Sequence, residues 1–133
     1  MHLIVDGFVS QRQVLEDEKA IYKFLDEYPA RIGMTRISSP LVFRYVGKKK
    51  EDWGISGFVF IAESHLSIHT FVERLFVNVD IFSCKDFDAE QVIRDLREWL
   101  KFTKFRSQLF DRSWDSLPQQ EGPQLFAAER VVP

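Results

Sequence analysis

Apolar residues form short runs and alternating stretches along much of the chain, a pattern typical of β-strands. Strict alternation over residues 65–69 places Leu66 and Ile68 on one face and His65, Ser67 and His69 on the other. The predicted strands cover residues 3–9, 40–46, 56–62, 65–69, 75–83 and 103–111. The three central runs follow one another closely, which predicts an antiparallel meander.

Two segments show helical spacing instead. Apolar residues recur every three or four positions from Val14 to Tyr28, and Pro29 is expected to end that helix. A second helix is predicted from Asp88, as its N-cap, to about Trp99 or Lys101. Residues 31–39 are expected to hold a further brief strand.

These elements predict an α+β fold, an antiparallel sheet with two main helices on one face. Two helices cover only one face of such a sheet. We therefore expect the sandwich to be completed by dimerisation, with two protomers pairing their sheets.

Composition narrows the class of protein. The 133 residues carry 18 basic and 20 acidic side chains, for a net charge of −2, which argues against a strongly basic nucleic-acid-binding protein. A single cysteine excludes an intrachain disulfide and a four-cysteine zinc site. No apolar run approaches the ~20 residues of a membrane helix, and the first residues lack the features of a signal peptide. We expect a soluble cytoplasmic protein.

The segment Glu63–Thr70 concentrates two histidines and two hydroxyl residues between apolar strands. On a strand, His65 and His69 would lie about 13 Å apart, so the pair does not predict a metal site. No G-x-S-x-G pattern is present for a hydrolase. Taken alone, these side chains are equally well explained as polar residues on the outer face of a strand.

The wider segment Ile61–Thr70 resembles the self-cleavage motif of the pyruvoyl-dependent S-adenosylmethionine decarboxylases, in their short bacterial and archaeal form. That family reads E-S-H-[hydrophobic]-[ST]-[hydrophobic]-H-T. Its downstream V-D-[hydrophobic]-F-[ST]-C block matches Val79–Cys84, and its upstream G-[hydrophobic]-S-G matches Gly54–Gly57. The positions agree in order and spacing without a gap.

The resemblance implies that the chain cleaves itself between Glu63 and Ser64 and converts Ser64 into a pyruvoyl cofactor. In such enzymes the pyruvoyl ketone forms a Schiff base with the substrate amine and accepts the electrons left by CO2. By resemblance, His69 is the acid or base of processing and Ser56 assists it, since an imidazole exchanges protons near neutral pH. Cys84 matches the residue that returns a proton to the α-carbon.

The residues at the family's substrate-binding positions match the family pattern less closely. Glu73 corresponds to the family's ribose-binding carboxylate, and Phe71 stands at its aromatic position. The family's Trp-Pro-Glu-Tyr-Gly-Tyr is here Phe-Val-Glu-Arg-Leu-Phe, over residues 71–76. The adenine-stacking Phe is absent from its matching position, so Trp53, or else Phe43 or Tyr45, is a candidate to stack on the purine.

The predicted function is decarboxylation of S-adenosylmethionine, which supplies the aminopropyl donor for spermidine synthesis. The positive charge of Arg74 is awkward beside a sulfonium, so the same chemistry on arginine or ornithine stays an alternative, as does a non-cleaving homologue that acts as a binding protein. We expect a homodimer of cleaved protomers and a small-molecule substrate, with no metal, nucleic acid or membrane partner. Residues 1–112 form the predicted decarboxylase-like domain and residues 113–133 a C-terminal extension without a counterpart.

Overall fold

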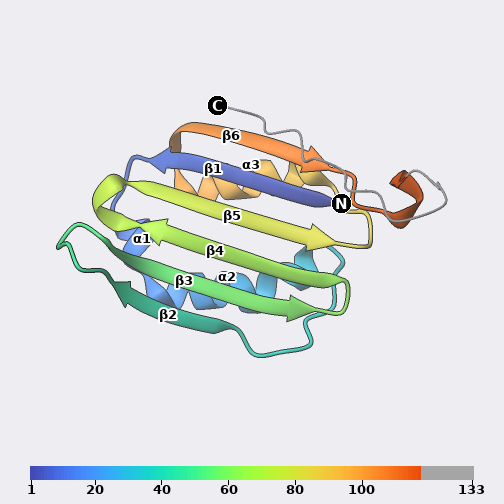
Figure 1. Ribbon diagram of the computed structural model, residues 1–133, viewed down its shortest axis with the longest axis horizontal. Coiled ribbons are helices and arrows are strands. Elements are labelled where there is room, and N and C mark those ends of the chain that lie inside the picture. Colours follow the sequence, from blue (N-terminus) through green and yellow to red (C-terminus); the bar gives the residue numbers. More distant parts are fainter. Residues whose placement is uncertain (118–133) are drawn as a thin grey trace.

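A single antiparallel sheet organises the computed structural model, which describes residues 1–117. Its six strands lie in the order β2-β3-β4-β5-β1-β6 (Figure 1). Their bounds are β1 (His2–Val9), β2 (Leu41–Val46), β3 (Trp53–Ile61), β4 (Ser64–Phe71), β5 (Phe76–Ser83) and β6 (Phe102–Phe110). The predicted central meander is confirmed as β3, β4 and β5, which pair in sequence order.

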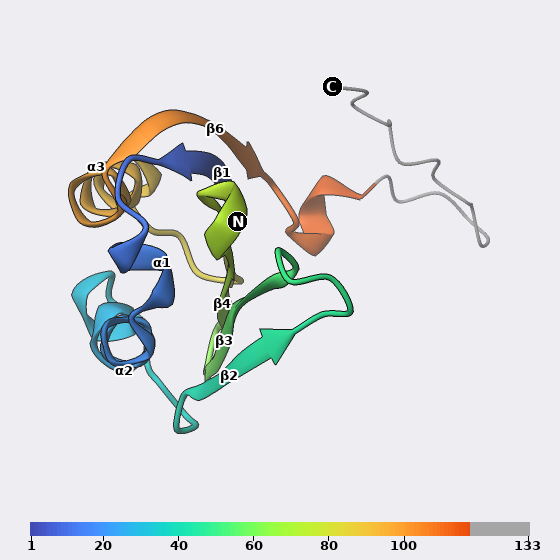
Figure 2. The ribbon, with the colours of Figure 1, turned by 90° about the vertical axis from the view of Figure 1, so that its left-hand side faces the viewer.

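Three helices cover one face of this sheet. They are α1 (Gln13–Glu16), α2 (Glu18–Arg31) and α3 (Ala89–Leu100), and Figure 2 shows all three on the same side. Two short 3-10 turns, η1 (Val72–Arg74) and η2 (Trp114–Ser116), follow β4 and β6. The α+β prediction, with the helices on one face, is therefore confirmed. Within residues 1–117, no helix is both long and apolar enough to cross a membrane.

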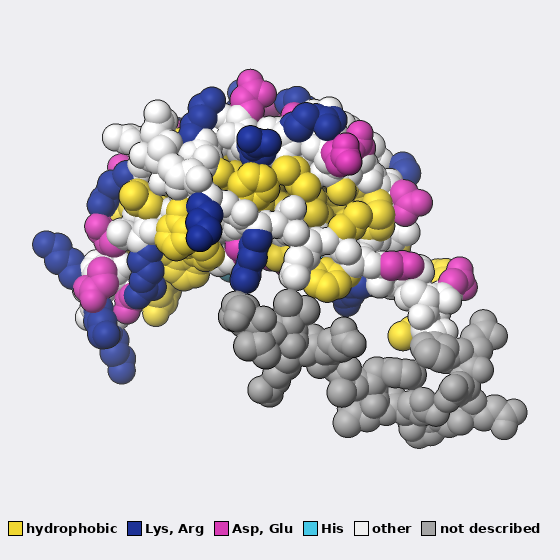
Figure 3. All heavy atoms as spheres, turned by 90° about the horizontal axis from the view of Figure 1, so that it is seen from above, with side chains coloured by type: hydrophobic (Ala, Val, Ile, Leu, Met, Phe, Trp, Pro, Cys, Tyr) yellow, Lys and Arg dark blue, Asp and Glu magenta, His cyan; other side chains and the backbone are white. Residues whose placement is uncertain are grey.

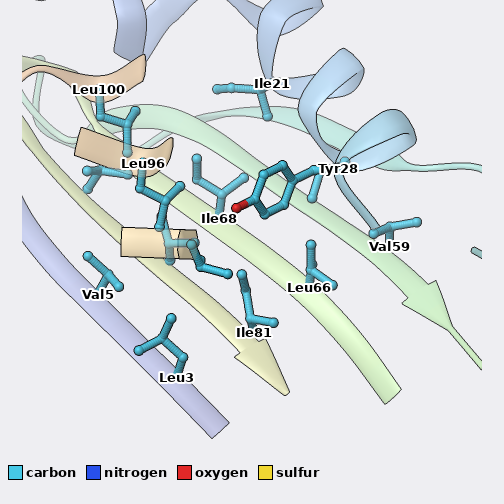
Figure 4. Packing of buried hydrophobic residues seen from close by; sticks show 14 of the residues in the cluster. Leu3, Val5, Ile21, Tyr28, Val59, Leu66, Ile68, Ile81, Leu96 and Leu100 are labelled. Atoms are coloured by element: carbon cyan, nitrogen blue, oxygen red, sulfur yellow. The ribbon is translucent and has the colours of Figure 1, made fainter. Parts of the chain in front are cut away.

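The core lies between the sheet and these helices. Alternate strand residues such as Val5, Leu66 and Ile81 point toward the helices, where they meet Ile21 and Leu96 (Figure 4). All five side chains are at most 1% exposed. Full burial of such a side chain contributes about 1.5–3 kcal/mol, so this layer accounts for much of the stability of the fold.

The first helical segment differs from its prediction in two ways. It is broken at Asp17, whose backbone leaves the helical conformation and whose side chain accepts a hydrogen bond from the Ala20 N–H and so caps α2. Pro29 lies inside α2, which continues to Arg31. A proline in the last turn removes one helical hydrogen bond, and the burial of Pro29 and Tyr28 offsets that loss.

Two other boundaries are corrected. Residues 31–39 hold no strand but an isolated bridge between Arg36 and Ile61. The strand predicted from Ser56 begins earlier, at Trp53, because β3 pairs with β2 over its whole first half. The second helix is confirmed, with the Asp88 side chain accepting the Gln91 N–H at its start.

The other face of the sheet carries polar and aromatic side chains from alternate strand positions, including His65, Ser67, His69, Asp80 and Phe82. We call it the open face, because all three α-helices of residues 1–117 lie on the opposite side of the sheet in Figure 2. Seen along the β6 edge, side chains of both charge signs surround a band of apolar groups (Figure 3).

Candidate active site

The predicted cleavage site lies at the tip of the hairpin between β3 and β4. A two-residue turn, Ala62–Glu63, joins the strands, and Ser64 is the first residue of β4. Ser64 has a φ of 154°, a backbone conformation that residues with a side chain rarely adopt. Such strain costs on the order of 1–3 kcal/mol and concentrates at functional sites. The peptide bond predicted to break thus immediately precedes a residue with a strained backbone.

Hydrogen bonds fix both the backbone carbonyl and the side-chain carboxylate of Glu63. Its carbonyl oxygen accepts the backbone N–H of Cys84 at 2.9 Å, and its carboxylate accepts the Thr35 N–H at 3.1 Å. The neighbouring Ala62 N–H donates to the Thr35 carbonyl at 2.8 Å. The carbonyl carbon of Glu63 is therefore fixed in place, with a hydrogen-bond donor already directed at its oxygen.

Cys84 follows β5 and reaches the same end of the sheet because Ser83 pairs with Ser64. The buried Ser83 hydroxyl accepts the Lys85 N–H at 2.9 Å and donates to the Lys85 carbonyl at 2.7 Å, which fixes the turn that carries Cys84. The thiol is free and exposed. The structure thus brings Ser64 and Cys84 to the same end of the sheet.

Ser56 and His69 form a second pair on the open face. They are opposite each other in the β3–β4 register, and His69 Nδ1 lies 2.9 Å from Ser56 Oγ. Both line a pocket of about 450 Å³ that also includes Tyr45 and Phe71. A hydroxyl and an imidazole in hydrogen-bond contact at a solvent-accessible pocket are equipped to transfer protons.

These two pairs stand at opposite ends of β4. His69 is five residues beyond Ser64 on one strand, which corresponds to about 17 Å. In Figure 1, β4 runs through the middle of the sheet from the cleavage hairpin to the opposite end of the strands. Within one chain, therefore, Ser64 and Cys84 do not meet Ser56 and His69.

Glu73 is tied into an ion pair. Both of its carboxylate oxygens accept from Arg12, each at 2.7 Å, and one also accepts the Trp53 Nε1–H at 2.9 Å. Hydrogen bonds from Arg12 and Trp53 lower the pKa of Glu73 to about 2. Glu73 and Trp53 thus lie together at the end of the sheet, with the carboxylate ionised.

Replacing Arg12 with methionine should raise the pKa of Glu73 toward its ordinary value of 4.5, followed as the side-chain carboxyl shift by NMR from pH 2 to 6. Because the pKa is depressed in the folded state, the ion pair contributes stability above about pH 4.5 and loses it as the pH falls toward 2. Arg106→Met, which removes an ion pair with Asp6, is the matched control and should leave Glu73 unchanged. An unaltered Glu73 titration in Arg12→Met would refute this assignment.

Arg74 does not present a free charge to the pocket. Its guanidinium lies 2.6 Å from the Asp52 carboxylate, and both residues line the pocket of Ser56 and His69. The positive charge that favoured an arginine or ornithine substrate is therefore neutralised locally. Phe71 lies on the open face with its ring centroid 6.0 Å from that of Phe76.

An aromatic row beside the cleavage hairpin went unnoticed in the sequence. The His65 ring stacks on Phe58 at 5.1 Å and meets Phe82 edge-on at 5.6 Å. Burial among these rings is the main cause that lowers the pKa of His65, so the imidazole stays neutral at neutral pH. The three rings come from β3, β4 and β5. The sequence could have indicated the row only if the pairing of these strands had been known.

Comparisons with known proteins agree with this architecture. The S-adenosylmethionine decarboxylase family matches residues 1–113. The S-adenosylmethionine decarboxylase proenzyme of Archaeoglobus fulgidus is 30% identical over 112 residues, which cover 84% of this chain and 95% of that protein. The proenzyme of a Clostridium botulinum strain is 34% identical over 104 residues, 77% of this chain and 84% of its own.

The fold also has a solved counterpart. The crystal structure of the adenosylmethionine decarboxylase from Aquifex aeolicus superposes with a TM-score of 0.69 at 21% identity, over 92% of this chain and 95% of that one. The architecture is thus that of a known decarboxylase. With the family match over residues 1–113, this chain belongs to the S-adenosylmethionine decarboxylase family, which confirms the resemblance drawn from the motif.

Proposed function

We propose that this chain is a cytoplasmic, self-processing pyruvoyl-dependent enzyme that decarboxylates S-adenosylmethionine and so supplies the aminopropyl donor for spermidine synthesis. Family membership supports the reaction class. The observation that carries the proposal for this chain is the cleavage hairpin, where a strained Ser64 follows a Glu63 carbonyl that is held by the Cys84 N–H.

Self-processing begins at this hairpin. The Ser64 hydroxyl attacks the carbonyl carbon of Glu63, and the Cys84 N–H stabilises the negative charge that develops on the carbonyl oxygen. The C–N bond then breaks, which leaves Glu63 as an ester on the Ser64 oxygen and frees the Ser64 nitrogen. This acyl shift relieves the strained backbone at Ser64.

Removal of the Ser64 α-proton expels the Glu63 carboxylate and splits the chain into residues 1–63 and 64–133. Water then replaces the nitrogen of the resulting dehydroalanine, and ammonia leaves. The second chain now begins with a pyruvoyl group. When formed, this ketone supplies an electron sink for decarboxylation of an amino acid.

The proton transfers need a residue that one chain does not bring to Ser64. His69 and its partner Ser56 lie about 17 Å from Ser64 along β4. We therefore propose a homodimer in which the open faces meet, so that Ser56 and His69 of one copy lie against Ser64 and Cys84 of the other. The uncovered face and its exposed aromatic residues, such as Phe60, support this arrangement.

On the substrate side, we propose that the ionised Glu73 accepts hydrogen bonds from the ribose hydroxyls, with Phe71 and Trp53 beside the nucleoside. The bonds from Arg12 and Trp53 fix the Glu73 carboxylate in one orientation. We place the decarboxylase domain at residues 1–112 and an extension at 113–133, of which residues 118–133 lie outside the described part of the structure.

Substrate identity is tested by release of labelled CO2 from S-adenosylmethionine, arginine and ornithine, each carrying the label in its carboxyl group. S-adenosylmethionine should react at least about 100-fold faster than the other two, because the site holds groups for a ribose and a purine. Faster release from arginine or ornithine would overturn the substrate assignment while leaving the reaction class intact.

Replacing Cys84 with alanine should leave cleavage at Glu63–Ser64 intact, since the backbone N–H of residue 84 remains. Decarboxylation should fall about 100-fold or more, or be diverted to transamination of the pyruvoyl group, because the thiol that protonates the α-carbon is gone. Mass spectrometry measures the cleavage and CO2 release the turnover. Cys84→Ser, which keeps a proton donor, should retain more activity, and turnover at the wild-type rate in Cys84→Ala would remove the thiol from the mechanism.

A further inference from the structure

The strained backbone of Ser64 has a fixed residue on each side of it. A strained conformation persists only where the surrounding structure holds the chain in place. Before Ser64, hydrogen bonds from the Cys84 and Thr35 N–H groups hold Glu63. After it comes His65, which takes no part in the proposed proton transfers and is held by contacts of a different kind.

The imidazole of His65 packs between rings from the two neighbouring strands. It stacks on Phe58 of β3, with centroids 5.1 Å and planes 27° apart, and it meets Phe82 of β5 edge-on at 5.6 Å. His65 is directly opposite Phe82 in the β4–β5 register, so this contact is a cross-strand pair. Because burial between the rings lowers the pKa of His65, the imidazole makes these contacts as an uncharged ring at neutral pH.

The two flanking rings are themselves held in place. Phe58 meets Phe60 edge-on at 4.8 Å. The Phe82 centroid is 5.5 Å from that of the His2 ring and 3.9 Å from the Arg112 guanidinium. The aromatic row therefore extends over β3, β4, β5 and β1, and it fixes the position of residue 65 relative to all of them.

Anchors on both sides limit how the backbone of Ser64 can relax. Rotation of its φ from 154° toward an ordinary value would have to displace either the Glu63 carbonyl or the His65 ring. The strain therefore persists until the C–N bond between Glu63 and Ser64 breaks. Release of that strain favours the acyl shift over the intact peptide.

We propose that His65 is a positioning residue for self-cleavage, whose ring, and not its proton, holds Ser64 in the strained conformation from which the acyl shift begins. The inference rests on the proposed function, because it takes Glu63–Ser64 as the bond that breaks. His65 acts through its contacts with Phe58 and Phe82 and through the backbone that it shares with Ser64.

The test follows cleavage of freshly synthesised chains in the wild type, His65→Phe, His65→Gln and His65→Ala. Phenylalanine keeps a ring without a titratable group, glutamine keeps hydrogen-bonding groups without a ring, and alanine has neither. Each chain is made by cell-free translation and then incubated at several values between about pH 6 and pH 8, the range in which a histidine titrates. Denaturing mass spectrometry of timed samples gives the rate of cleavage.

Phe8→Ala is the matched control. It also removes an aromatic ring from the open face, one that lies 5.0 Å from the ring of Phe76. That pair stands at the opposite end of the strands from the cleavage hairpin, because Phe8 pairs with Phe76 and Phe76 with Phe71. Urea unfolding of each variant measures how much stability the loss of a ring costs.

His65→Ala and His65→Gln should each cleave about tenfold more slowly than the wild type, because the ring contacts are gone. His65→Phe should cleave within about twofold of the wild-type rate and with the same pH dependence, and Phe8→Ala should cleave at the wild-type rate. Slow cleavage in His65→Phe, a changed pH dependence in that variant, or rescue by glutamine would assign the role to the imidazole nitrogens and overturn the inference.

Equal slowing in His65→Ala and Phe8→Ala would attribute the effect to lost stability and would also overturn the inference. If the wild type itself does not cleave, the inference falls together with the proposed function. Wild-type cleavage that is unaffected in His65→Ala refutes the inference alone.

Discussion

Ser64→Ala should yield a single uncleaved chain of 133 residues, with processing below about 1% of the wild-type extent. Alanine has no hydroxyl to attack the Glu63 carbonyl, and without that attack neither the ester nor the pyruvoyl group forms. Denaturing intact mass spectrometry measures the outcome directly. The variant should also lack decarboxylase activity.

Ser67→Ala is the matched control for this variant, because Ser67 is another serine of β4, three residues from the cleavage site. That chain should cleave as the wild type does. If Ser64→Ala still splits between residues 63 and 64, the nucleophile is a different group and the proposed processing step is wrong.

His69→Ala should also remain uncleaved as a homodimer, yet become cleaved when co-expressed with Ser64→Ala. In a mixed dimer, Ser64 of the His69→Ala chain faces His69 of the Ser64→Ala chain, which completes one site. With random pairing of equal amounts, up to about half of the His69→Ala chains should split. Mass spectrometry distinguishes the products, since each substitution marks its own chain.

Two other results of that experiment would contradict different parts of the account. No cleavage in the mixture, with mixed dimers demonstrated, would contradict a site shared between copies. Cleavage of His69→Ala on its own would remove His69 from processing. Ser67→Ala co-expressed with His69→Ala is a further control, because both Ser64 and His69 are intact on the Ser67→Ala chain and it should support cleavage of its partner.

Much of the fold followed from local patterns. Alternation over residues 65–69 identified β4 and its two faces, and Asp88 marked the start of α3 because its side chain can cap the first turn. The break at Asp17 was missed, since periodicity continues across it and only the cap geometry reveals it. The expectation that Pro29 ends this helix is wrong, because a proline in the last helical turn loses just one hydrogen bond.

The motif supplied the candidate residues but not their arrangement. The resemblance gave His69 a role in processing at Ser64, whereas strand geometry separates the two residues by about 17 Å within one chain. The hydrogen bond from Cys84 to Glu63 depends on the pairing of β4 with β5, which no local pattern specifies.

The central claim is that this chain makes its own pyruvoyl group at Ser64. An intact mass spectrum of freshly purified wild-type protein under denaturing conditions tests it most directly. We predict two chains, residues 1–63 and residues 64–133, with a pyruvoyl group at the start of the second. A single uncleaved chain that persists after prolonged incubation would contradict the claim and favour a homologue that binds a metabolite without processing itself.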